Sequence, residues 1–401
     1  MDLFVYLDNK YIGILSIEFV KGKEITSFCY DDNYLSSIKG ATTLFDPEIS
    51  PFKGRQYSYK NIFGFVSDTL PDRFGRVLIN KQEEELAKKE NRLPRKLNEL
   101  DYLVRVNDIT RSGAIRFKVD KTGEYINDAK DAVPLYIYLR DIEQASIEFE
   151  KNGTLENKKY QRLLLPGSSL GGARPKANIY YNDELWIAKF PSSSDTYDVE
   201  AWEKVMFDLM SLVNINVTDN RIEKLSPYGS TFLLKRFDRD GKRRVHYASF
   251  ITMLNVEDGN RDVSYVDIAD FIRTQCIDVE TNLNELYKRI VFNYIVNNTD
   301  NHLRNIGLLL TEKGWTLSPN FDVNPSFYIA DYALPIVNGK YHIEYDDLIE
   351  NAKYFLLEKE KAQTIIKDMK ITIIDNIEKL AFKYGIEKNS VSAILSIIKN
   401  K

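Results

Sequence analysis

Cysteine is scarce in this sequence. The only thiols among its 401 residues belong to Cys29 and Cys276, which lie far apart along the chain. Two cysteines are too few for the disulfide framework of a small secreted domain, and their separation does not match the ligand spacing of a zinc site. The sequence therefore predicts a protein of a reducing, intracellular compartment, and we expect it to be cytoplasmic.

Long apolar runs are also missing. A membrane-spanning helix requires about 18 consecutive apolar residues, and no such stretch occurs. The first residues, MDLFVYLDNKYIG, lack the basic segment followed by an apolar run that defines a secretory signal peptide. We therefore expect neither a membrane anchor nor a membrane partner.

Neither sign of charge dominates. The chain carries 55 Lys and Arg against 59 Asp and Glu, a net charge of -4, so no global basic field predicts binding to nucleic acid. Aromatic residues make up 12%, which argues against a disordered chain. Because single cores stop growing near about 250–300 residues, the length of 401 residues predicts more than one domain.

Strand and helix patterns divide the chain into a mixed first half and a mainly helical second half. The expected elements are three strands in 1–30, a helix in 60–90 interrupted at Pro71, a turn and strand at 111–120, a hairpin at 177–190, a helix at 198–213, a strand at 230–238, a helix at 283–296, a hairpin at 306–317 and helices after 346. We therefore predict an α+β N-terminal lobe with small antiparallel sheets and a mostly α-helical C-terminal lobe, with domains at 1–125, 126–240 and 241–401.

The stretch GSSLGGARPKA at 167–177 is rich in glycine and lies just before a strand. Gly171 and Gly172 allow backbone N–H groups to approach phosphate oxygens, and Arg174 and Lys176 add charges suited to phosphate. The stretch matches neither the Walker A pattern nor G-x-G-x-x-G. A phosphate-binding loop and an ordinary surface loop both remain open.

Lys189 ends an apolar strand in the sequence WIAKF. A lysine in this position resembles the V-A-I-K element of protein kinases, whose ammonium group holds the phosphates of ATP. On the next helix Glu203 is the candidate to pair with Lys189, as a kinase αC glutamate does, and Glu200 is the rival. The alternative is a lysine that points out of an edge strand.

The strand FLLKRFDR at 232–239 offers apolar side chains on which an adenine ring can stack. Asp238 is then the candidate to bind the ribose hydroxyls. The competing interpretation is an aspartate in a Phe-Asp-Arg-Asp-Gly turn, where Asp bonds nearby backbone groups.

The stretch NNTDNHLRNIGLLL at 297–310 crowds ionisable and amide side chains in front of an apolar run. Asp300 and Asn305 form the D-x-x-x-x-N pair of a kinase catalytic loop, and Asp322 follows on the far side of the predicted hairpin. One carboxylate would accept the proton of a hydroxyl, while the Asn and the second Asp would hold Mg²⁺. A simple polar turn is the alternative.

Two further side chains belong to this stretch. His302 is expected to be structural, because a carboxylate base does not need a group that titrates near neutrality. Arg304 is a candidate contact to the transferring phosphate. Both are therefore assigned supporting roles.

Five motifs, taken in order, resemble the HipA family of bacterial serine/threonine kinases, the toxin halves of HipBA-type toxin–antitoxin pairs. They are GSSLGGARPKA, WIAKFPS, FLLKRFDR, NNTDNHLRNIGLLL and LSPNFDVNPS. Near the N-terminus, VYLDNKYIGILS, IFGFVSDTLPDRFGRVLI and SGAIRF are similar to the family's N-terminal subdomain. The resemblance thus covers nearly the whole chain.

The resemblance implies a protein-kinase-like two-lobe fold that uses ATP and Mg²⁺. It implies that 1–125 is the N-terminal subdomain, 126–240 the kinase N-lobe with phosphate loop and hinge, and 241–401 the C-lobe with the catalytic and metal-binding loops. In that C-lobe, Asp300 matches the catalytic aspartate, and Asn305 and Asp322 match the Mg²⁺ ligands.

The same resemblance implies roles in the N-lobe. Ser169, or Ser168 beside it, matches the autophosphorylated serine of a mobile phosphate loop, and Lys235 to Phe237 matches the adenine-binding hinge. The implied ATP-binding residues are Ser169, Gly171, Gly172, Lys176, Lys189, Lys235, Phe237 and Asp238.

The leading hypothesis is a serine/threonine kinase that autophosphorylates and phosphorylates a translation component, which in family members includes aminoacyl-tRNA synthetases, to arrest growth. The alternative is mainly a non-catalytic co-repressor that binds a HipB-like helix-turn-helix antitoxin, and DNA only through it. A small-molecule kinase would share every nucleotide-binding residue and is set aside only by the resemblance.

Overall fold

The computed structural model describes residues 1–38, 45–129, 133–153 and 174–401. The chain divides into two compact units, each assembled from two separate stretches. Unit 1 comprises Met1–Ser193 and Arg236–Asn255, and unit 2 comprises Ser194–Lys235 and Val256–Lys401. Each unit thus brings together stretches that are distant in sequence.

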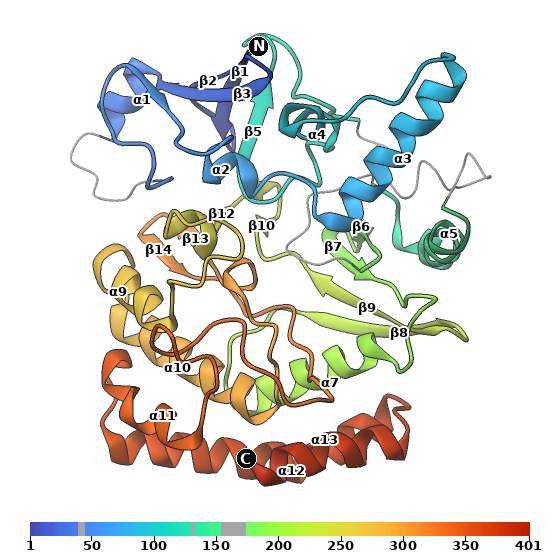
Figure 1. The fold of residues 1–401 in the computed structure, drawn as a ribbon, viewed down its shortest axis with the longest axis vertical. Coiled ribbons are helices and arrows are strands. Elements are labelled where there is room, and N and C mark those ends of the chain that lie inside the picture. The colour runs from blue at the N-terminus through green and yellow to red at the C-terminus, as the bar shows by residue number, and fades with distance from the viewer. Residues whose placement is uncertain (39–44, 130–132, 154–173) are drawn as a thin grey trace. The chain divides into compact units, whose positions relative to one another are not determined.

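Unit 1 is built on a five-stranded antiparallel sheet of order β4-β3-β2-β1-β5 (Figure 1). Its strands are β1 (Asp2–Leu7), β2 (Lys10–Val20), β3 (Lys23–Tyr30), β4 (Arg55–Tyr57) and β5 (Ile115–Lys118). The three strands predicted in 1–30 are present. The first turn places Asp8 at φ 53°, a left-handed conformation that Asp tolerates better than most residues.

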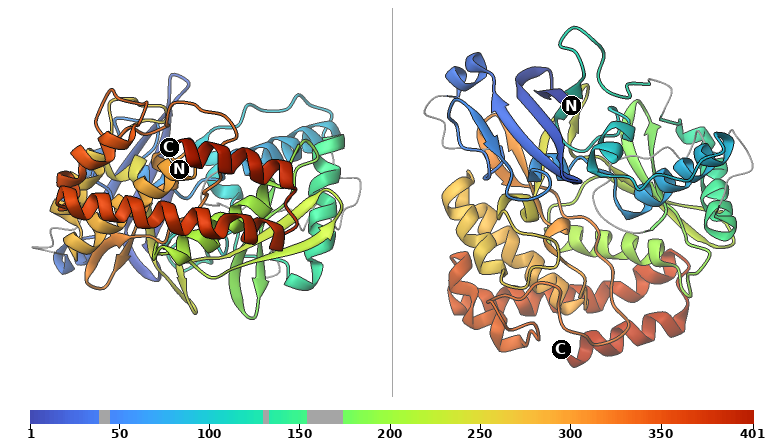
Figure 2. Two further views of the ribbon diagram at one scale, coloured as in Figure 1. Left: turned by 90° about the horizontal axis from the view of Figure 1, so that it is seen from below. Right: turned by 45° about the horizontal axis from the view of Figure 1, so that its top comes forward.

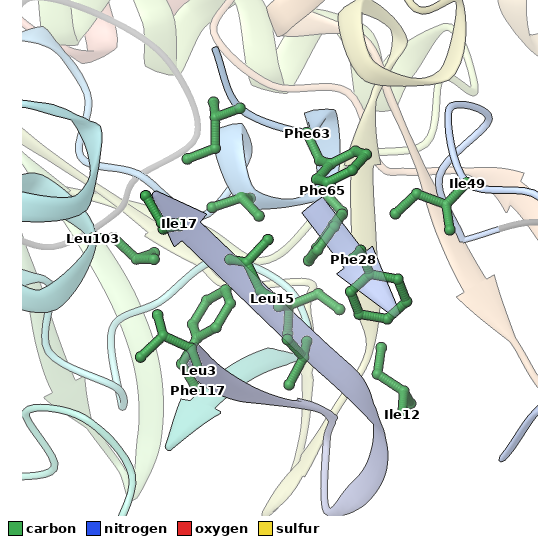
Figure 3. Close-up of a cluster of buried hydrophobic side chains, with 14 of the residues drawn as sticks. Leu3, Ile12, Leu15, Ile17, Phe28, Ile49, Phe63, Phe65, Leu103 and Phe117 are labelled. Atoms are coloured by element: carbon green, nitrogen blue, oxygen red, sulfur yellow. The ribbon is translucent and has the colours of Figure 1, made fainter. Parts of the chain in front are cut away.

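The apolar core of unit 1 lies against one face of this sheet (Figure 3). Side chains alternate between the two faces along a strand, so Leu15 and Ile17 of β2 both point into this core. Phe28 of β3 meets Phe65 of α2 (Gly64–Ser67), with ring centroids 5.7 Å apart. Full burial of such a side chain stabilises the fold by about 1.5–3 kcal/mol.

The helix predicted in 60–90 is interrupted as expected. After α2 the chain passes Pro71, and α3 (Arg73–Lys89) begins with Asp72 as its N-cap. The Asp72 carboxylate accepts a hydrogen bond from the N–H of Gly75 at 2.7 Å, which satisfies one of the free donors of the first turn.

Further elements complete unit 1. They are α1 (Asp32–Ser37), α4 (Glu99–Arg105), a 3₁₀ turn (Tyr136–Tyr138), α5 (Leu139–Asn152), β6 (Lys176–Tyr181), β7 (Glu184–Lys189), β10 (Arg239–Asp240), β11 (Arg243–Arg244), β12 (His246–Ser249) and α8 (Phe250–Met253). The predicted hairpin at 177–190 corresponds to β6 and β7. Its turn residues Asn182 and Asp183 have φ of 52° and 60°, as a two-residue turn of this kind requires.

Unit 2 is mainly helical. Its elements are α7 (Val199–Leu212), β8 (Asn220–Ser226), β9 (Gly229–Lys235), α9 (Tyr265–Gln275), α10 (Val279–Ile295), a 3₁₀ turn (Leu303–Asn305), β13 (Gly307–Thr311), β14 (Gly314–Leu317), α11 (Tyr345–Glu350), a 3₁₀ turn (Ala352–Phe355), α12 (Lys359–Lys383) and α13 (Lys388–Asn400). All the elements predicted here are present, and β8 was not anticipated.

Two long helices of unit 2, α12 and α13, lie beside α7. Helices α12 and α13 run side by side, and α12 packs against α7 (Figure 2). The buried indole of Trp202 on α7 donates a hydrogen bond to the Ser390 hydroxyl of α13 at 2.9 Å. Within the described ranges, no helix is long and apolar enough to cross a membrane.

Candidate functional site

The loop that follows α10 carries the predicted catalytic residues; we call residues 297–305 the catalytic loop. The N–H of His302 donates to the carbonyl of Asp300 at 2.9 Å, and the N–H of Asn305 donates to the carbonyl of His302 at 2.8 Å. The Asn305 amide nitrogen reaches back to the Asp300 carbonyl at 3.4 Å. The loop therefore folds on itself, and Asp300 and Asn305 are brought together as their spacing predicts.

The Asp300 carboxylate is exposed and electrostatically perturbed. Partial burial raises its pKa above the ordinary value, His302 opposes the rise, and the negative charge of Asp322 adds to it. Asp322 thus lies close enough to Asp300 for the two carboxylates to interact. Asp322 itself sits at φ 58°, a left-handed conformation that directs the chain at this point.

Asn305 has the property expected of a metal ligand. Its side chain is 2% exposed, and its Oδ1 atom is buried without a hydrogen-bond partner. Buried polar atoms are normally bonded, so an amide oxygen without a hydrogen-bond partner fits a Mg²⁺ ligand. In the part of the chain that the structure describes, no group of three or more His, Cys, Asp or Glu could hold a metal. Mg²⁺ needs fewer protein ligands than such a group supplies, because the ion retains several of its waters.

Three other polar side chains belong to the catalytic loop or the residues near Asp322. The Nδ1 atom of His302 and the Oδ1 atom of Asn324 are buried without hydrogen-bond partners. Arg304 pairs with Asp258 at 3.1 Å, and both side chains are well exposed, at 37% and 71%. An ion pair between exposed side chains stabilises the fold by only about 0–1 kcal/mol.

The predicted lysines Lys176 and Lys189 belong to unit 1. The register of the β6–β7 hairpin places Lys176 opposite Lys189, so the two side chains share one face. Lys189 is only 6% exposed, which is unlike a lysine that points from an edge strand into water. The Lys176 ammonium pairs with the Asp72 carboxylate at 3.1 Å, and both side chains are 6% exposed.

The predicted partners of Lys189 lie on α7. Glu200 and Glu203 are both 1% exposed and belong to unit 2, whereas Lys189 belongs to unit 1. Burial of both carboxylates leaves the choice between them open. The pairing of Lys189 with Glu203 stays a prediction.

The residues of the predicted hinge are in different surroundings. The Lys235 ammonium lies 3.8 Å from the carboxylate of exposed Asp219, and the Phe237 ring packs 5.9 Å from that of Tyr247. Four residues of the predicted phosphate loop, Ser168, Ser169, Gly171 and Gly172, lie outside the described residues.

Asp238 has a role that the sequence did not indicate. Its side chain is completely buried and accepts from Arg236 at 2.5 and 2.8 Å and from the N–H of Gly113 at 2.7 Å, and Arg239 lies at 2.9 Å. Burial would raise the pKa of Asp238, but the two arginines outweigh it and hold the pKa well below its usual range. A carboxylate enclosed in this way is not presented to a ribose, and a structural role replaces that prediction.

Asp238 belongs to a larger group, which we call the arginine cluster. Its members are Arg111, Arg116, Arg236, Arg239, Arg244, Asp108 and Asp238. The second carboxylate, Asp108, pairs with Arg116 at 2.5 Å and Arg244 at 2.6 Å. Arg239 also donates to the carbonyl of Arg111 at 2.6 Å. The cluster therefore fastens the motif RFDR to residues 108–113 within unit 1.

The sequence reasoning missed Asn297. This residue is 1% exposed, with φ 59°, and its amide nitrogen donates to the carbonyls of Ser326 at 2.7 Å and Tyr328 at 2.9 Å. The only available signal was its place at the end of a predicted helix, where asparagine is common for local reasons. Its long-range bonds carry no local signature.

Comparison with known proteins gives a consistent result. The family model described as HipA-like C-terminal domain matches residues 168–377. A putative kinase of Haemophilus influenzae is 25% identical over 179 residues, which cover 39% of this chain and 52% of that protein. Putative kinase Y4dM of Sinorhizobium fredii is 23% identical over 206 residues, 45% of this chain and 44% of the relative. Each match spans about half the length of the relative.

A solved structure extends the likeness to the whole chain. A chain in the complex of the Shewanella oneidensis MR-1 toxin–antitoxin proteins HipA and HipB with operator DNA superposes with a TM-score of 0.71. The match covers 99% of this chain and 95% of that chain at 16% identity. This likeness shows the fold, and the predicted HipA-like two-lobe fold with small antiparallel sheets and a helical part is confirmed.

Proposed function

Because this chain belongs to the HipA family, we propose that it is a kinase that transfers the γ-phosphoryl group of ATP, with Mg²⁺, to a seryl or threonyl hydroxyl. The observation that carries the proposal is the geometry of the catalytic loop. There the exposed Asp300 is folded against Asn305, whose amide oxygen has no hydrogen-bond partner, and lies within the electrostatic reach of Asp322.

Each residue has a chemical task in this proposal. Asp300 accepts the proton of the attacking hydroxyl, and its raised pKa makes the carboxylate a better base. Asn305 and Asp322 would hold Mg²⁺, which neutralises charge on the phosphates. Lys189, which lies beside Lys176 on the same face of the β6–β7 hairpin, is the proposed phosphate-binding lysine.

The remaining nucleotide contacts follow the family pattern. The segment from Lys235 to Phe237 is proposed to bind adenine, with Arg304 near the transferring phosphate. Autophosphorylation is proposed at Ser169, or at Ser168 beside it. A phosphoserine carries about −1.5 to −2 charge at pH 7, so it would repel the nucleotide from its own loop.

The substrate and partner are proposed on the same basis. A translation component such as an aminoacyl-tRNA synthetase is the proposed substrate. A HipB-like helix-turn-helix protein is the proposed partner, supported by the similarity to a chain solved together with HipB and operator DNA. That similarity also favours the second candidate function, a co-repressor that needs no phosphoryl transfer.

Phosphate incorporation separates the two functions. The protein is incubated with radiolabelled ATP, with Mg²⁺ or with a chelator, as wild type and as Asp300→Asn. We expect Mg²⁺-dependent labelling of the wild type, and a loss of about 10²–10⁴-fold in the variant, because an amide cannot accept the proton. Asp346→Asn is the matched control, since Asp346 is an exposed carboxylate of the same unit.

Two outcomes count against the kinase. Labelling of Asp300→Asn at the rate of the Asp346→Asn control would remove Asp300 as the base. No labelling of the wild type, combined with binding to a helix-turn-helix partner, would leave the co-repressor as the function.

A further inference from the structure

Asn297 joins the catalytic loop to the residues that follow Asp322; we call residues 322–333 the Asp322 segment. The backbone carbonyl of Asn297 accepts from the N–H of Ser326 at 2.9 Å. The side-chain amide nitrogen of Asn297 donates to the carbonyls of Ser326 and Tyr328 at 2.7 and 2.9 Å. One side chain and its backbone thus make three bonds between the two stretches.

A second residue of the catalytic loop strengthens this junction. The Thr299 and Ser326 hydroxyls lie 2.7 Å apart, and the Thr299 carbonyl accepts from the N–H of Ala333 at 2.8 Å. The stretch with Asp300 and Asn305 and the stretch with Asp322 are therefore held together at residues 297–299. Their relative position decides whether Asn305 and Asp322 can act on one ion.

The Lys401 ammonium, which follows α13, reaches this junction. Its Nζ atom donates to the Asn297 Oδ1 atom at 2.7 Å, to the Tyr294 carbonyl at 2.7 Å and to the Tyr332 hydroxyl at 2.6 Å. An ammonium group has three donors, and all three are used here. Burying such a charge is unfavourable unless it is bonded in this way, and the rings of Tyr294 and Tyr332 add cation–π contacts.

From these contacts we propose that Lys401 is a positioning residue that orients the Asn297 amide and so sets the spacing between the catalytic loop and the Asp322 segment. The inference rests on the proposed function. An amide side chain presents oxygen on one side and nitrogen on the other, and the two are nearly equal in size. The ammonium can donate only to the amide oxygen, so the amide nitrogen faces the Ser326 and Tyr328 carbonyls.

The Tyr294 bond alone would suggest a simpler role. That carbonyl lies in the last turn of α10, so this contact by itself would only attach the residues after α13 to the end of α10. The contact with Asn297 differs, because the acceptor already bridges two functional stretches. The experiment must therefore distinguish a local attachment from control of the junction.

Hydrogen exchange at single amides makes this distinction without any need for activity. The variant is Lys401→Met, which retains the apolar stem, and the matched control is Lys399→Met, an exposed lysine of α13. We expect exchange at the Ser326 and Ala333 amides to become roughly tenfold faster in Lys401→Met, as loss of one charged hydrogen bond predicts, and to be unchanged in Lys399→Met.

Kinetics give the second readout. We expect the Mg²⁺ concentration for half-maximal phosphoryl transfer to rise about tenfold in Lys401→Met, as it does when residues behind metal ligands are removed. The KM for ATP at saturating Mg²⁺ should stay within about twofold, because no contact to nucleotide is removed. A residue that only attaches a helix would lower thermal stability without this change.

A double-mutant cycle with Asn297→Gly tests the route of the effect, since glycine accepts the left-handed φ of this position. If Lys401 acts through Asn297, the two exchange effects are not additive, and the double variant resembles Asn297→Gly alone. Additive effects, or exchange in Lys401→Met equal to the Lys399→Met control, would overturn the inference. Absence of phosphoryl transfer in the wild type would instead overturn the proposed function, and the exchange data would still decide the role of Lys401.

Discussion

The arginine cluster of unit 1 and the catalytic loop of unit 2 use the same kinds of side chain in opposite ways. In the cluster, Asp238 is fully buried and bonded to two arginines and a backbone N–H. In the loop, Asp300 is exposed, and the Asn305 oxygen near it is buried without a partner. A carboxylate whose oxygens are bonded stabilises a fold, whereas one beside unsatisfied groups is available for chemistry.

If the arginine cluster stabilises the fold, the largest loss of stability is expected when Asp238 is replaced. Replacement by Asn removes the negative charge that pairs with buried Arg236 and Arg239, so Asp238→Asn should lower the free energy of unfolding by about 3–5 kcal/mol. Asp240→Asn is the control: Asp240 lies two residues away, is 67% exposed and pairs with Arg243 at the surface. Its effect should stay below about 1 kcal/mol. Urea unfolding measures both, and equal effects would show that the cluster does not depend on Asp238.

A smaller effect is expected at Asp322, and on ligand binding instead of stability. Asp322→Asn should weaken Mg²⁺-dependent ATP binding by about 10–100-fold while ATP binding without Mg²⁺ is unchanged. Calorimetry with and without Mg²⁺ measures the two affinities. Equal ATP affinity under both conditions in the wild type would remove Asn305 and Asp322 as metal ligands.

The smallest effect is expected at Asp46, a buried carboxylate of unit 1. Unlike Asp238, which pairs with arginines, Asp46 is bonded to backbone N–H groups. Its oxygens accept from the backbone N–H groups of Glu48 and Phe65, each at 2.8 Å, and burial raises its pKa to about 6. The folded protein therefore takes up this proton before the unfolded chain does, whose Asp pKa is about 3.9. The contribution of Asp46 to the free energy of unfolding should therefore increase as pH falls from about 6 towards 4. It should disappear as pH rises through about 6.

Comparison with Asp46→Asn isolates this contribution, because the variant has no proton to bind there. Relative to the variant, the wild type should gain about 1.4 kcal/mol between pH 7.5 and pH 5. Chemical unfolding at the two pH values measures the difference. A difference between wild type and variant that does not change with pH would show that Asp46 is not perturbed in the folded protein.

Local patterns in the sequence were sufficient for the hairpins and helices that were predicted, whereas helices such as α4 and α5 were not anticipated. The β6–β7 hairpin follows from its turn residues Asn182 and Asp183, and the break between α2 and α3 from Pro71, because both depend on the backbone preferences of a few adjacent residues. The strand β8 was missed. Its pattern of partial burial lacks the clear alternation by which a strand is recognised.

The candidate site was predictable to the extent that it is local. Asp300 and Asn305 are five positions apart, and a tight loop brings such neighbours together whatever surrounds them. Asp322 was placed with them through a short hairpin. The surroundings of Asp238 were not predictable, because they are not local. The sequence near Asp238 shows only an aspartate next to a strand, and nothing there indicates its bond to Gly113.

By itself, the sequence determined the hairpins and helices with clear local patterns, the spacing of Asp300 and Asn305, and a family resemblance that the comparison with known proteins confirmed. Tertiary structure alone decided which polar groups are satisfied. Asp238 is bonded to a residue 125 positions away, and Lys401 to one 104 positions away. The energy of a charge depends on burial and on its partners in space, and neither is encoded in its neighbours along the chain.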